Sequence, residues 1–416
     1  MPRRQGHTLL FALVAGTAAL AAAVAFGTSL VTSTRQAPPA GTQARPAVRH
    51  PAAPAHSSGT WVVTWTGAPA QPEPHTAQGY TGRIIHNTVH TSIGGDAARI
   101  TLSNLFGTTP LVVEQATVAT RPVTFRGLGT VTVAAGRQVV SDAVTVPVAP
   151  DADLIVGLHA ARGGEPVTLH PSSHQTSYQS DGTLTWPTTA WRYLTTVDVR
   201  HDAAPGAIVV IGDSLTAGTR STTDTDSRWP DVLSDRLRHR YGVANQGIAG
   251  NRLLRDSLKP GGAGGPSGAH RFDRDVLSVA GARTVIVALG INDVQQAPQE
   301  TDARRIVAGL RSLTDRAHAQ GLRVIGTTLT PFQGYATWTP ERNAVRLAVN
   351  ERIRAGGVFD GFADFDRAVR DPYAPNRILP AYDSGDRLHL NDTGYRVLGE
   401  LIGPEAVTGV PRTAAF

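Results

Sequence analysis

The sequence predicts two folded parts of different class: an antiparallel β-sandwich or jelly-roll-like domain in residues 59–203, then an α/β/α domain with a parallel sheet in residues 204–416. Short strand-like runs without intervening helices indicate the first part, and alternating strand-like and helix-like segments indicate the second. The length of 416 residues also exceeds one typical domain. Hydrophobic residues make up 41% of the chain, which is enough apolar material for two cores.

Residues 1–31 are typical of an export signal or an N-terminal anchor, because Arg3 and Arg4 precede a long uncharged apolar run. About 20 apolar residues suffice to cross a bilayer, so cleavage and permanent anchoring both stay open. In either case the positive charges before the run predict that the rest of the chain is secreted or held on the outer face of the cytoplasmic membrane. The Ala- and Pro-rich residues 32–58 predict a flexible linker.

Composition excludes several classes of function. The net charge is +6, but five arginines in residues 1–58 supply most of it, and the remaining chain has 34 basic and 33 acidic side chains. A nearly neutral body has no general attraction for phosphate backbones, so no nucleic-acid partner is expected. The absence of cysteine excludes disulfides, a thiol nucleophile, iron–sulfur clusters and thiolate zinc sites.

Strand-like runs in the first part are rich in β-branched and aromatic residues, and Gly, Pro, Asn and Asp separate them. Examples are Trp61–Trp65, Thr88–Thr91, Arg99–Leu102 and Val131–Val133. Tryptophans at positions 61, 65, 186 and 191 are suited either to stacking on sugar rings or to core packing. Core packing is the better prediction for each, because buried aromatic side chains supply most of the buried area in a small sandwich.

His86 and His90 have the i,i+4 spacing of a helical zinc motif, but they lie in strand-like sequence and lack the glutamate of that motif. We therefore expect ordinary strand histidines at both positions. The sequence marks no metal ligands and predicts no cofactor, and it leaves open whether a structural metal binds a loop.

The second part alternates short apolar strands with helical segments, as a doubly wound domain requires. The predicted strands are Ala207–Ile211, Gly242–Asn245, Thr284–Leu289 and Leu322–Thr327. The predicted helices are Trp229–Arg240, Phe272–Ala280, Asp302–Ala319 and Glu341–Arg354. In such a sheet the ligand site lies beyond the carboxyl ends of the strands, so the residues that follow each strand are the candidates.

Polar motifs follow three of these strands. They are Gly212-Asp213-Ser214-Leu215, Asn245-Gln246-Gly247-Ile248-Ala249-Gly250-Asn251 and Gly290-Ile291-Asn292-Asp293. A fourth motif, Asp386-Arg387-Leu388-His389, precedes a last helix that starts around Asp392. Together they supply a hydroxyl, a histidine, a carboxylate and several hydrogen-bond donors, which are the groups that acyl transfer needs.

A serine hydroxyl is a weak nucleophile, so Ser214 needs a histidine base, and the base needs a carboxylate on its other ring nitrogen. Asp386 and His389 are three residues apart, which on a single turn puts both side chains on the same side. The expected oxyanion donors are the N–H groups of Ser214 and Gly250 and the side-chain amide of Asn292. These groups converge if the three strands are neighbours.

The four motifs resemble those of the SGNH hydrolases, also called GDSL esterases and lipases, over about residues 207–400. The resemblance implies a flavodoxin-like α/β/α sheet and a carboxylic ester hydrolase that needs no cofactor. It implies that Ser214 is the nucleophile, that His389 is the base and that Asp386 orients this base.

The same resemblance assigns the oxyanion hole to Gly250 and Asn292 together with the N–H of Ser214. Arg387 departs from the family pattern, which often has a small residue there, so the shape of this loop is in question. Thr216 occupies the second Gly position of a GxSxG motif, and the nucleophile elbow of the α/β-hydrolases is therefore absent.

The first part bears a weaker resemblance to extracellular SGNH proteins with an N-terminal β-domain. The segments that carry it are Thr60–Trp65, Arg99–Gly107 and Ser227–Pro230. Some of these relatives are assigned to arabinoxylan breakdown, which implies an acetylated plant polysaccharide or oligosaccharide as the substrate.

We therefore predict an exported, monomeric serine esterase that hydrolyses short-chain acyl esters, with acetyl esters preferred. Two alternatives stay open: a GDSL lipase or phospholipase that acts on longer acyl chains, and a catalytically inert carbohydrate-binding protein of the cell surface. The joint presence of Ser214, Asn292, Asp386 and His389 counts against the inert protein, because such a domain has no chemical need for all four.

Overall fold

The computed structural model describes residues 59–76, 79–257 and 264–408, all of which belong to one unit of the chain. The predicted export signal or anchor and the predicted linker lie outside the described residues. None of the helices within the described ranges combines the length and the hydropathy that crossing a membrane requires.

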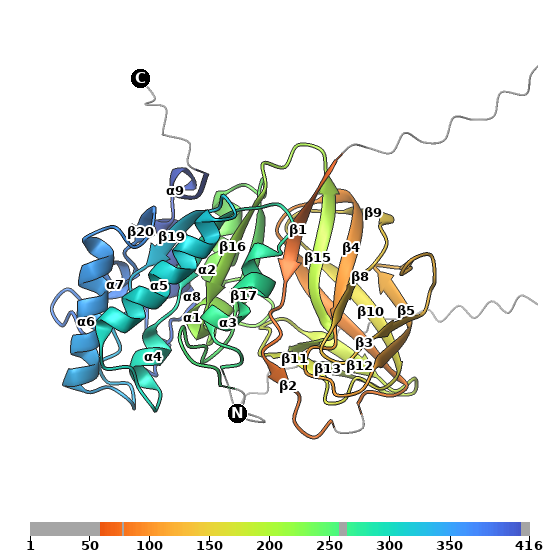
Figure 1. Ribbon diagram of the computed structural model, residues 1–416, viewed down its shortest axis with the longest axis horizontal. Coiled ribbons are helices and arrows are strands. Elements are labelled where there is room, and N and C mark those ends of the chain that lie inside the picture. The colour runs from red at the N-terminus through yellow and green to blue at the C-terminus, as the bar shows by residue number, and fades with distance from the viewer. Residues whose placement is uncertain (1–58, 77–78, 258–263, 409–416) are drawn as a thin grey trace, which may run out of the picture. The chain divides into compact units, whose positions relative to one another are not determined.

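Antiparallel strands fill the first part of the described chain (Figure 1). They are β1 (Thr60–Thr66), β2 (Gln71–Pro72), β3 (Arg83–Thr91), β4 (Gly95–Ser103), β5 (Leu111–Val118), β6 (Arg121–Val123), β7 (Val131–Val133), β8 (Gln138–Val140), β9 (Val144–Val148), β10 (Ala152–Arg162), β11 (Thr168–Pro171), β12 (Ser177–Ser180), β13 (Thr185–Thr188), β14 (Ala190–Arg192) and β15 (Leu194–His201). Three sheets result, with the orders β1-β15-β4-β8, β13-β12-β3-β10-β5-β6 and β14-β11-β2; β9 pairs with β4, and β7 pairs with β5. The prediction of antiparallel β-structure is confirmed.

The two larger sheets share one hydrophobic core. Ile100 and Val197 of the first sheet are fully buried in the same cluster as Ile85, Val113 and Val156 of the second. Along β9 buried and exposed positions alternate, as expected for a strand with only one face on the core.

The four tryptophans of this part divide into two pairs. Trp65 and Trp191 are buried and meet edge to face with ring centroids 4.7 Å apart, as the prediction of core packing requires. Trp61 and Trp186 instead stay partly exposed, each beneath an arginine guanidinium 4.7 or 4.8 Å from the ring centroid. The prediction is wrong for this second pair, where a cation–π contact at the surface takes the place of core packing.

A five-stranded parallel sheet follows in the second part. Its strands are β16 (Ala207–Gly212), β17 (Gly242–Gly247), β18 (Ala282–Ala288), β19 (Arg323–Thr327) and β20 (Gly361–Ala363), in the order β17-β16-β18-β19-β20. The first four confirm the predicted strands to within two residues at each end. The edge strand β20 escaped prediction because three residues are too few for a periodic pattern.

Helices cover both faces of this sheet (Figure 1). They are α1 (Ser214–Ala217), α2 (Trp229–Arg236), α3 (Gly268–Phe272), the π-helical turn η1 (Asp273–Leu277), α4 (Ile291–Gln295), α5 (Ala303–His318), α6 (Pro340–Arg354), α7 (Phe365–Val369), α8 (Asp392–Leu401) and α9 (Pro404–Thr408). Val209 and Ile211 of β16 pack in the cluster that contains residues of α3, α5 and α6. Ile208 and Val210 pack in the cluster that contains residues of α2 and α8, which confirms the α/β/α class.

Two predicted helices differ from the observed ones. The helix predicted to reach Arg240 ends at Arg236, because Arg238 and His239 adopt left-handed backbone conformations with φ of 54° and 50°. The helix predicted over Phe272–Ala280 is a continuation of α3 into η1, whose wider turns end before Ser278.

Direct hydrogen bonds join the antiparallel part to the parallel sheet. The Thr66 hydroxyl at the end of β1 donates to the carbonyl of Asn245 in β17 over 3.0 Å. The N–H of Val243, also in β17, donates to the Ser92 hydroxyl oxygen over 2.9 Å. The strand that carries one of the predicted site motifs is thus fixed against the β-structure beside it.

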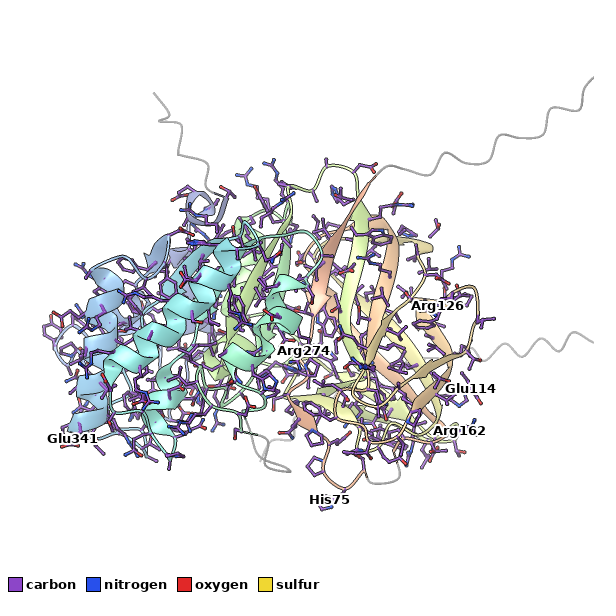
Figure 2. The ribbon with its side chains drawn as sticks, viewed as in Figure 1. His75, Glu114, Arg126, Arg162, Arg274 and Glu341 are labelled. Carbon is purple, nitrogen blue, oxygen red and sulfur yellow. The ribbon has the colours of Figure 1, made fainter. Side chains whose placement is uncertain are left out.

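Glu114, Arg126, Arg162 and Glu341 are exposed, and Figure 2 shows them at the surface. Arg346 in α6 is a fully buried exception. A buried guanidinium needs charged and hydrogen-bonding partners to offset the loss of water.

The partners of Arg346 come from three segments. Its Nη1 donates to Asp366 Oδ1 over 2.5 Å and to the carbonyl of Leu329 over 3.1 Å, and its Nε donates to Asn343 Oδ1 over 3.0 Å. Asp366, at the start of α7, is equally buried. This pair therefore links α6 and α7 to the loop that follows β19.

We expect Arg346→Met to lower the free energy of unfolding by about 3 kcal/mol, because the buried Asp366 carboxylate loses one charged partner. Arg304→Met is the matched control, since the pair of Arg304 with Asp302 is exposed and such pairs contribute about 0–1 kcal/mol. Urea unfolding measures both variants. Equal losses in the two would contradict the importance of the buried pair.

Candidate active site

Ser214 lies where β16 leaves the sheet. Asp213 caps α1, with its Oδ1 accepting the N–H of Leu215 over 3.0 Å, and Ser214 is the first residue of that helix. A Cβ on Gly212 would lie 2.0 Å from Thr216 Oγ1, so only glycine permits this close turn. The serine hydroxyl is consequently held at the carboxyl edge of the sheet, as predicted.

His389 and Asp386 form a hydrogen-bonded line with Ser214. His389 Nε2 lies 2.9 Å from Ser214 Oγ, and His389 Nδ1 lies 2.7 Å from Asp386 Oδ2. A proton on Nδ1, donated to the carboxylate, leaves the lone pair of Nε2 facing the serine hydroxyl. The structure therefore brings together the three predicted residues in the order that proton transfer needs.

The carboxylate of Asp386 is oriented by its own loop. Its Oδ1 accepts the N–H groups of Leu388 and His389 over 3.0 and 2.8 Å. Burial favours the neutral acid, but the hydrogen bonds from the His389 ring and from these backbone groups outweigh it and lower the pKa of Asp386 below its usual value. The group is therefore ionised wherever His389 acts as a base.

Gly250 and Asn292, the predicted oxyanion donors, are linked by a residue that the sequence analysis missed. Gln296 Nε2 donates to the carbonyl of Gly250 over 2.8 Å and to Asn292 Oδ1 over 2.9 Å. Asn292 Nδ2 in turn donates to the carbonyl of Asn251 over 3.0 Å. Gln296 follows Asn292 by four residues at the end of α4, and this i,i+4 spacing was the signal that could have identified it.

A buried arginine ties the strand ends to one another. Arg271 in α3 donates to the carbonyl of Gly212 at the end of β16 over 2.9 Å and to that of Gln246 in β17 over 2.7 Å. Its guanidinium also donates to Asn251 Oδ1, and Asp275 balances its charge at 3.0 Å. Burial lowers the pKa of Arg271 to about 10, which leaves it charged at neutral pH. No sequence motif marks this residue.

Two buried aspartates shape the loops around Ser214. Asp293 accepts the N–H groups of Leu253 and Leu254 over 2.6 and 3.0 Å and fixes the loop after β17. Burial raises the pKa of Asp293, and it raises the pKa of Asp213 to about 7. Asp213 thus changes charge near neutral pH while it caps the helix of Ser214.

Two arginines occur near Asp386: the side chain of Arg220 lies beside its carboxylate, and Arg387 follows it in the sequence. The side chain of Arg220 is 62% exposed, and its Nε lies 3.7 Å from Asp386 Oδ2. Arg387, the departure from the family pattern, adopts a left-handed conformation with φ of 71° and pairs with Asp383 over 2.7 Å. The loop therefore accommodates this arginine and still presents His389 to Ser214.

Residues 210–397 match the model of the GDSL-like Lipase/Acylhydrolase family. No curated protein matches the chain at a significant level. Solved structures similar to it include a carbohydrate acetylesterase family member from Sinorhizobium meliloti, with 20% identity over 49% of this chain and 100% of that one and a TM-score of 0.40.

Two further similar structures are the aryl esterase of M. smegmatis and a member of the lipolytic protein G-D-S-L family from Veillonella parvula. Each is 18% identical over 47% of this chain and 94% of its own, with a TM-score of 0.37. The segment matched by the family model contains Ser214, Gly250, Asn292, Asp386 and His389.

Asp213→Asn tests the buried carboxyl beside Ser214. A folded pKa of about 7, above the usual 3.8, means that ionisation of Asp213 costs the folded state stability as the pH rises from about 4 to 7. The variant keeps an oxygen that accepts the N–H of Leu215 but cannot ionise. We expect its stability relative to wild type to increase between pH 4 and pH 8, by an amount on the order of a few kcal/mol.

Urea unfolding at both pH values measures this change. All other titrating groups are common to the two proteins, so their contributions cancel in the difference. A difference in stability that is the same at pH 4 and pH 8 would show that Asp213 has an ordinary pKa.

Proposed function

We propose that the chain is a serine esterase that hydrolyses short-chain acyl esters through its residues 210–397, a GDSL-like lipase/acylhydrolase domain of a carboxylic ester hydrolase family. The observation that carries the proposal is the unbroken line from Asp386 through His389 to Ser214, with distances of 2.7 and 2.9 Å. Within a domain of this family, such a line is the arrangement that activates a serine hydroxyl.

In the proposed mechanism the Ser214 oxygen attacks the ester carbonyl while His389 Nε2 takes the hydroxyl proton. Asp386 stabilises the imidazolium that forms. Collapse of the tetrahedral intermediate breaks the bond to the alcohol, which leaves with the proton from His389. A water molecule then gives its proton to His389, attacks the acyl-enzyme and releases the acid, and Ser214 regains its proton.

We assign the stabilisation of the tetrahedral oxyanion to the N–H groups of Ser214 and Gly250 and the side-chain amide of Asn292. Gln296 supports this assignment, because it binds the carbonyl of Gly250 and the side-chain oxygen of Asn292 at once. With its oxygen held by Gln296, the Asn292 amide is oriented with its NH₂ group as the donor.

Short acyl groups on a polar alcohol are the proposed substrates. Arg220 lies beside the proposed catalytic line with 62% of its side chain exposed, and a long alkyl chain gains little beside such a charge. Acetylated plant polysaccharide is the first natural substrate to test. The alternative of a sugar-binding protein without catalysis keeps only Trp61 and Trp186 as candidate sugar contacts, because Trp65 and Trp191 are buried and offer no face to a sugar ring.

We also propose that the enzyme acts outside the cytoplasm, on the basis of the apolar run that follows Arg3 and Arg4. Mass spectrometry of the N-terminus of protein recovered from medium and membrane fractions tests this location. Recovery only from the cytoplasm would refute it.

Hydrolysis of p-nitrophenyl esters from acetate to palmitate tests the reaction. We expect the rate to decline beyond about four carbons, Ser214→Ala to lose it, and Asp386→Asn to lower kcat by about 10⁴ because the base is left in the wrong tautomer. A maximum at eight carbons or more would favour the lipase. Equal rates in wild type and Ser214→Ala would refute the mechanism.

Asn292→Ala and Gln296→Leu separate a donor from the residue that positions it. We expect the first change to lower kcat by about 10²–10³, the loss typical of one oxyanion donor. For Gln296→Leu we expect a loss of about tenfold in kcat with KM unchanged, because the donors remain but are less well oriented. Loss confined to KM in the Gln296 variant would contradict the positioning role.

A further inference from the structure

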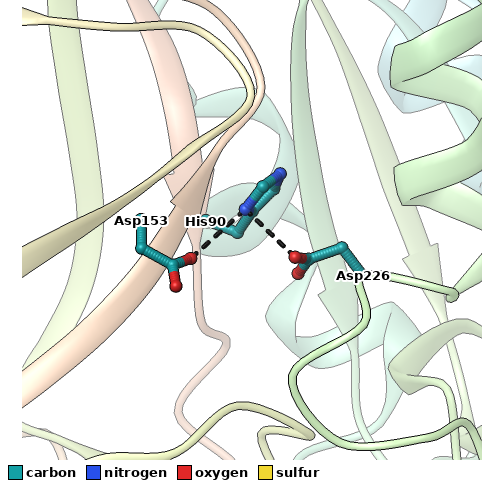
Figure 3. Close-up of side chains that lie close together, drawn as sticks. All are labelled: His90, Asp153 and Asp226. Carbon is teal, nitrogen blue, oxygen red and sulfur yellow. Dashed lines mark hydrogen bonds and ion pairs between the residues drawn. The ribbon is translucent and has the colours of Figure 1, made fainter.

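His90 in β3 faces two carboxylates that come from different parts of the chain. Its Nδ1 lies 3.3 Å from Asp153 Oδ1 in β10 and 3.2 Å from Asp226 Oδ2 in the segment between α1 and α2 (Figure 3). Figure 3 shows the two carboxylates approaching this nitrogen from opposite sides. The structure confirms that His90 is a strand residue, but its surroundings are not those of an ordinary strand histidine.

The other ring nitrogen of His90 is also engaged. Nε2 lies 3.0 Å from Asp151 Oδ1, so three carboxylates surround one imidazole. If Nε2 carries the proton donated to Asp151, a neutral Nδ1 turns its lone pair toward the oxygens of Asp153 and Asp226. If the ring carries both protons instead, Nδ1 has a single proton for the oxygens of both Asp153 and Asp226. The single positive charge of the ring then faces the negative charges of three carboxylates.

The surplus of negative charge extends further. His239 Nε2 lies 3.7 Å from Asp151 Oδ2 and 3.7 Å from Asp235 Oδ1, so Asp151 joins the two groups. Arg228 is close by, but its guanidinium is bound through two nitrogens to Asp231. Four aspartates thus share two histidines.

Asp226 is the least exposed of these carboxylates: its side chain is 28% exposed, against 55% to 63% for Asp151, Asp153 and Asp235. Asp153 is oriented by Gln175, whose Nε2 donates to its Oδ1 over 2.6 Å. A cation between Asp153 and Asp226 would offset the repulsion that both carboxylates experience.

A cavity of about 280 Å³ adjoins the group and is lined by His90, Asp151, Asp226, Asp235 and His239 among other residues. The indole of Trp65 also lines it; this residue is 4% exposed, and its Nε1 has no hydrogen-bond partner among the described residues. A buried N–H without a partner calls for a hydrogen-bond acceptor in the cavity, such as a water molecule bound to an ion. The space holds a hydrated ion with ease.

We propose that His90, Asp153 and Asp226 bind a divalent transition-metal ion of the Zn²⁺ type. Ligand atoms about 2.1 Å from a tetrahedral ion lie about 3.4 Å from one another, close to the separations of Nδ1 from the two carboxylate oxygens. The hydrogen bond from Nε2 to Asp151 is the carboxylate–histidine arrangement that orients a metal ligand. An imidazole ligand favours zinc-like ions over Ca²⁺ and Mg²⁺, which prefer oxygen.

Such an ion is structural. Asp153 and His90 are opposite residues on paired strands of the antiparallel part, whereas Asp226 belongs to the segment that runs from the helix of Ser214 to α2. Asp224 of the same segment already accepts the N–H and hydroxyl of Thr176 over 2.6 and 2.7 Å. The ion adds a second link between this segment and the β-structure, so its binding stabilises the folded chain by mass action.

The test is calorimetric titration of the chelator-treated full chain with Zn²⁺ at pH 7.5, together with thermal unfolding. We expect one ion per chain and a higher melting temperature with Zn²⁺. Asp226→Asn and His90→Gln are expected to weaken binding by about 100-fold or more, and Asp151→Asn by about 10–100-fold. His86→Gln, on the same strand but outside the group, is the matched control and is expected to bind as wild type does.

Several outcomes would overturn the proposal: no stoichiometric Zn²⁺ binding, binding of Ca²⁺ as tight as that of Zn²⁺, or unchanged binding in Asp226→Asn. If Asp235→Asn lost binding and Asp226→Asn retained it, the ion would be assigned to the group around His239. That result would refute the ligands proposed here. Circular dichroism and the metal-free melting temperature show whether each variant folds. Ser214→Ala is expected to bind Zn²⁺ as wild type does. The outcome of the metal-binding test is therefore independent of the outcome of the esterase test.

Discussion

The close approach of α1 to the ends of β16 and β17 is the constraint on which the rest of the site depends. Gly212 and Gly247 end these strands, and a Cβ on Gly247 would lie 2.3 Å from the backbone nitrogen of Ala217. Only strand ends that are formed by glycine let the helix begin directly at the sheet. This contact fixes the position of Ser214 independently of its catalytic partners. The loop that carries His389 therefore has to extend to Ser214.

Because the strand ends are fixed in this way, their backbone carbonyls are buried away from water. Arg271 donates hydrogen bonds to these carbonyls. It binds Gly212 and Gln246 at the ends of β16 and β17, and Asn251 in the loop beyond. A buried guanidinium in turn needs Asp275 beside it, because an unpaired buried charge is far costlier than an unpaired carbonyl. The pair of Arg271 and Asp275 is therefore a consequence of the geometry of the glycine turn. It contributes to catalysis only by stabilising that turn.

Local patterns were sufficient to predict what lies along the chain. Apolar runs followed by glycine and a polar residue predicted the strand ends, and the three-residue spacing predicted that Asp386 and His389 would meet on one loop. Residues that act across the fold were not predictable in this way. Arg271 carries no motif, and its role exists only because the ends of β16 and β17 both lie beside α3. Gln296 is intermediate, because its contact with Asn292 follows from helical spacing but its contact with Gly250 does not.

The histidines of β3 also show that spacing along the sequence does not predict contacts across the fold. Along a strand, residues four apart lie about 13 Å from each other, so His86 and His90 are too distant to share a ligand. Across a strand pair, opposite residues are about 5 Å apart, and the residue opposite His90 is Asp153. Asp151 lies two residues before Asp153, just ahead of β10 and in a left-handed backbone conformation with φ of 51°, and both carboxylates contact the ring of His90. In β-structure the partners of a candidate ligand have to be sought across the sheet, where the sequence gives no spacing to follow.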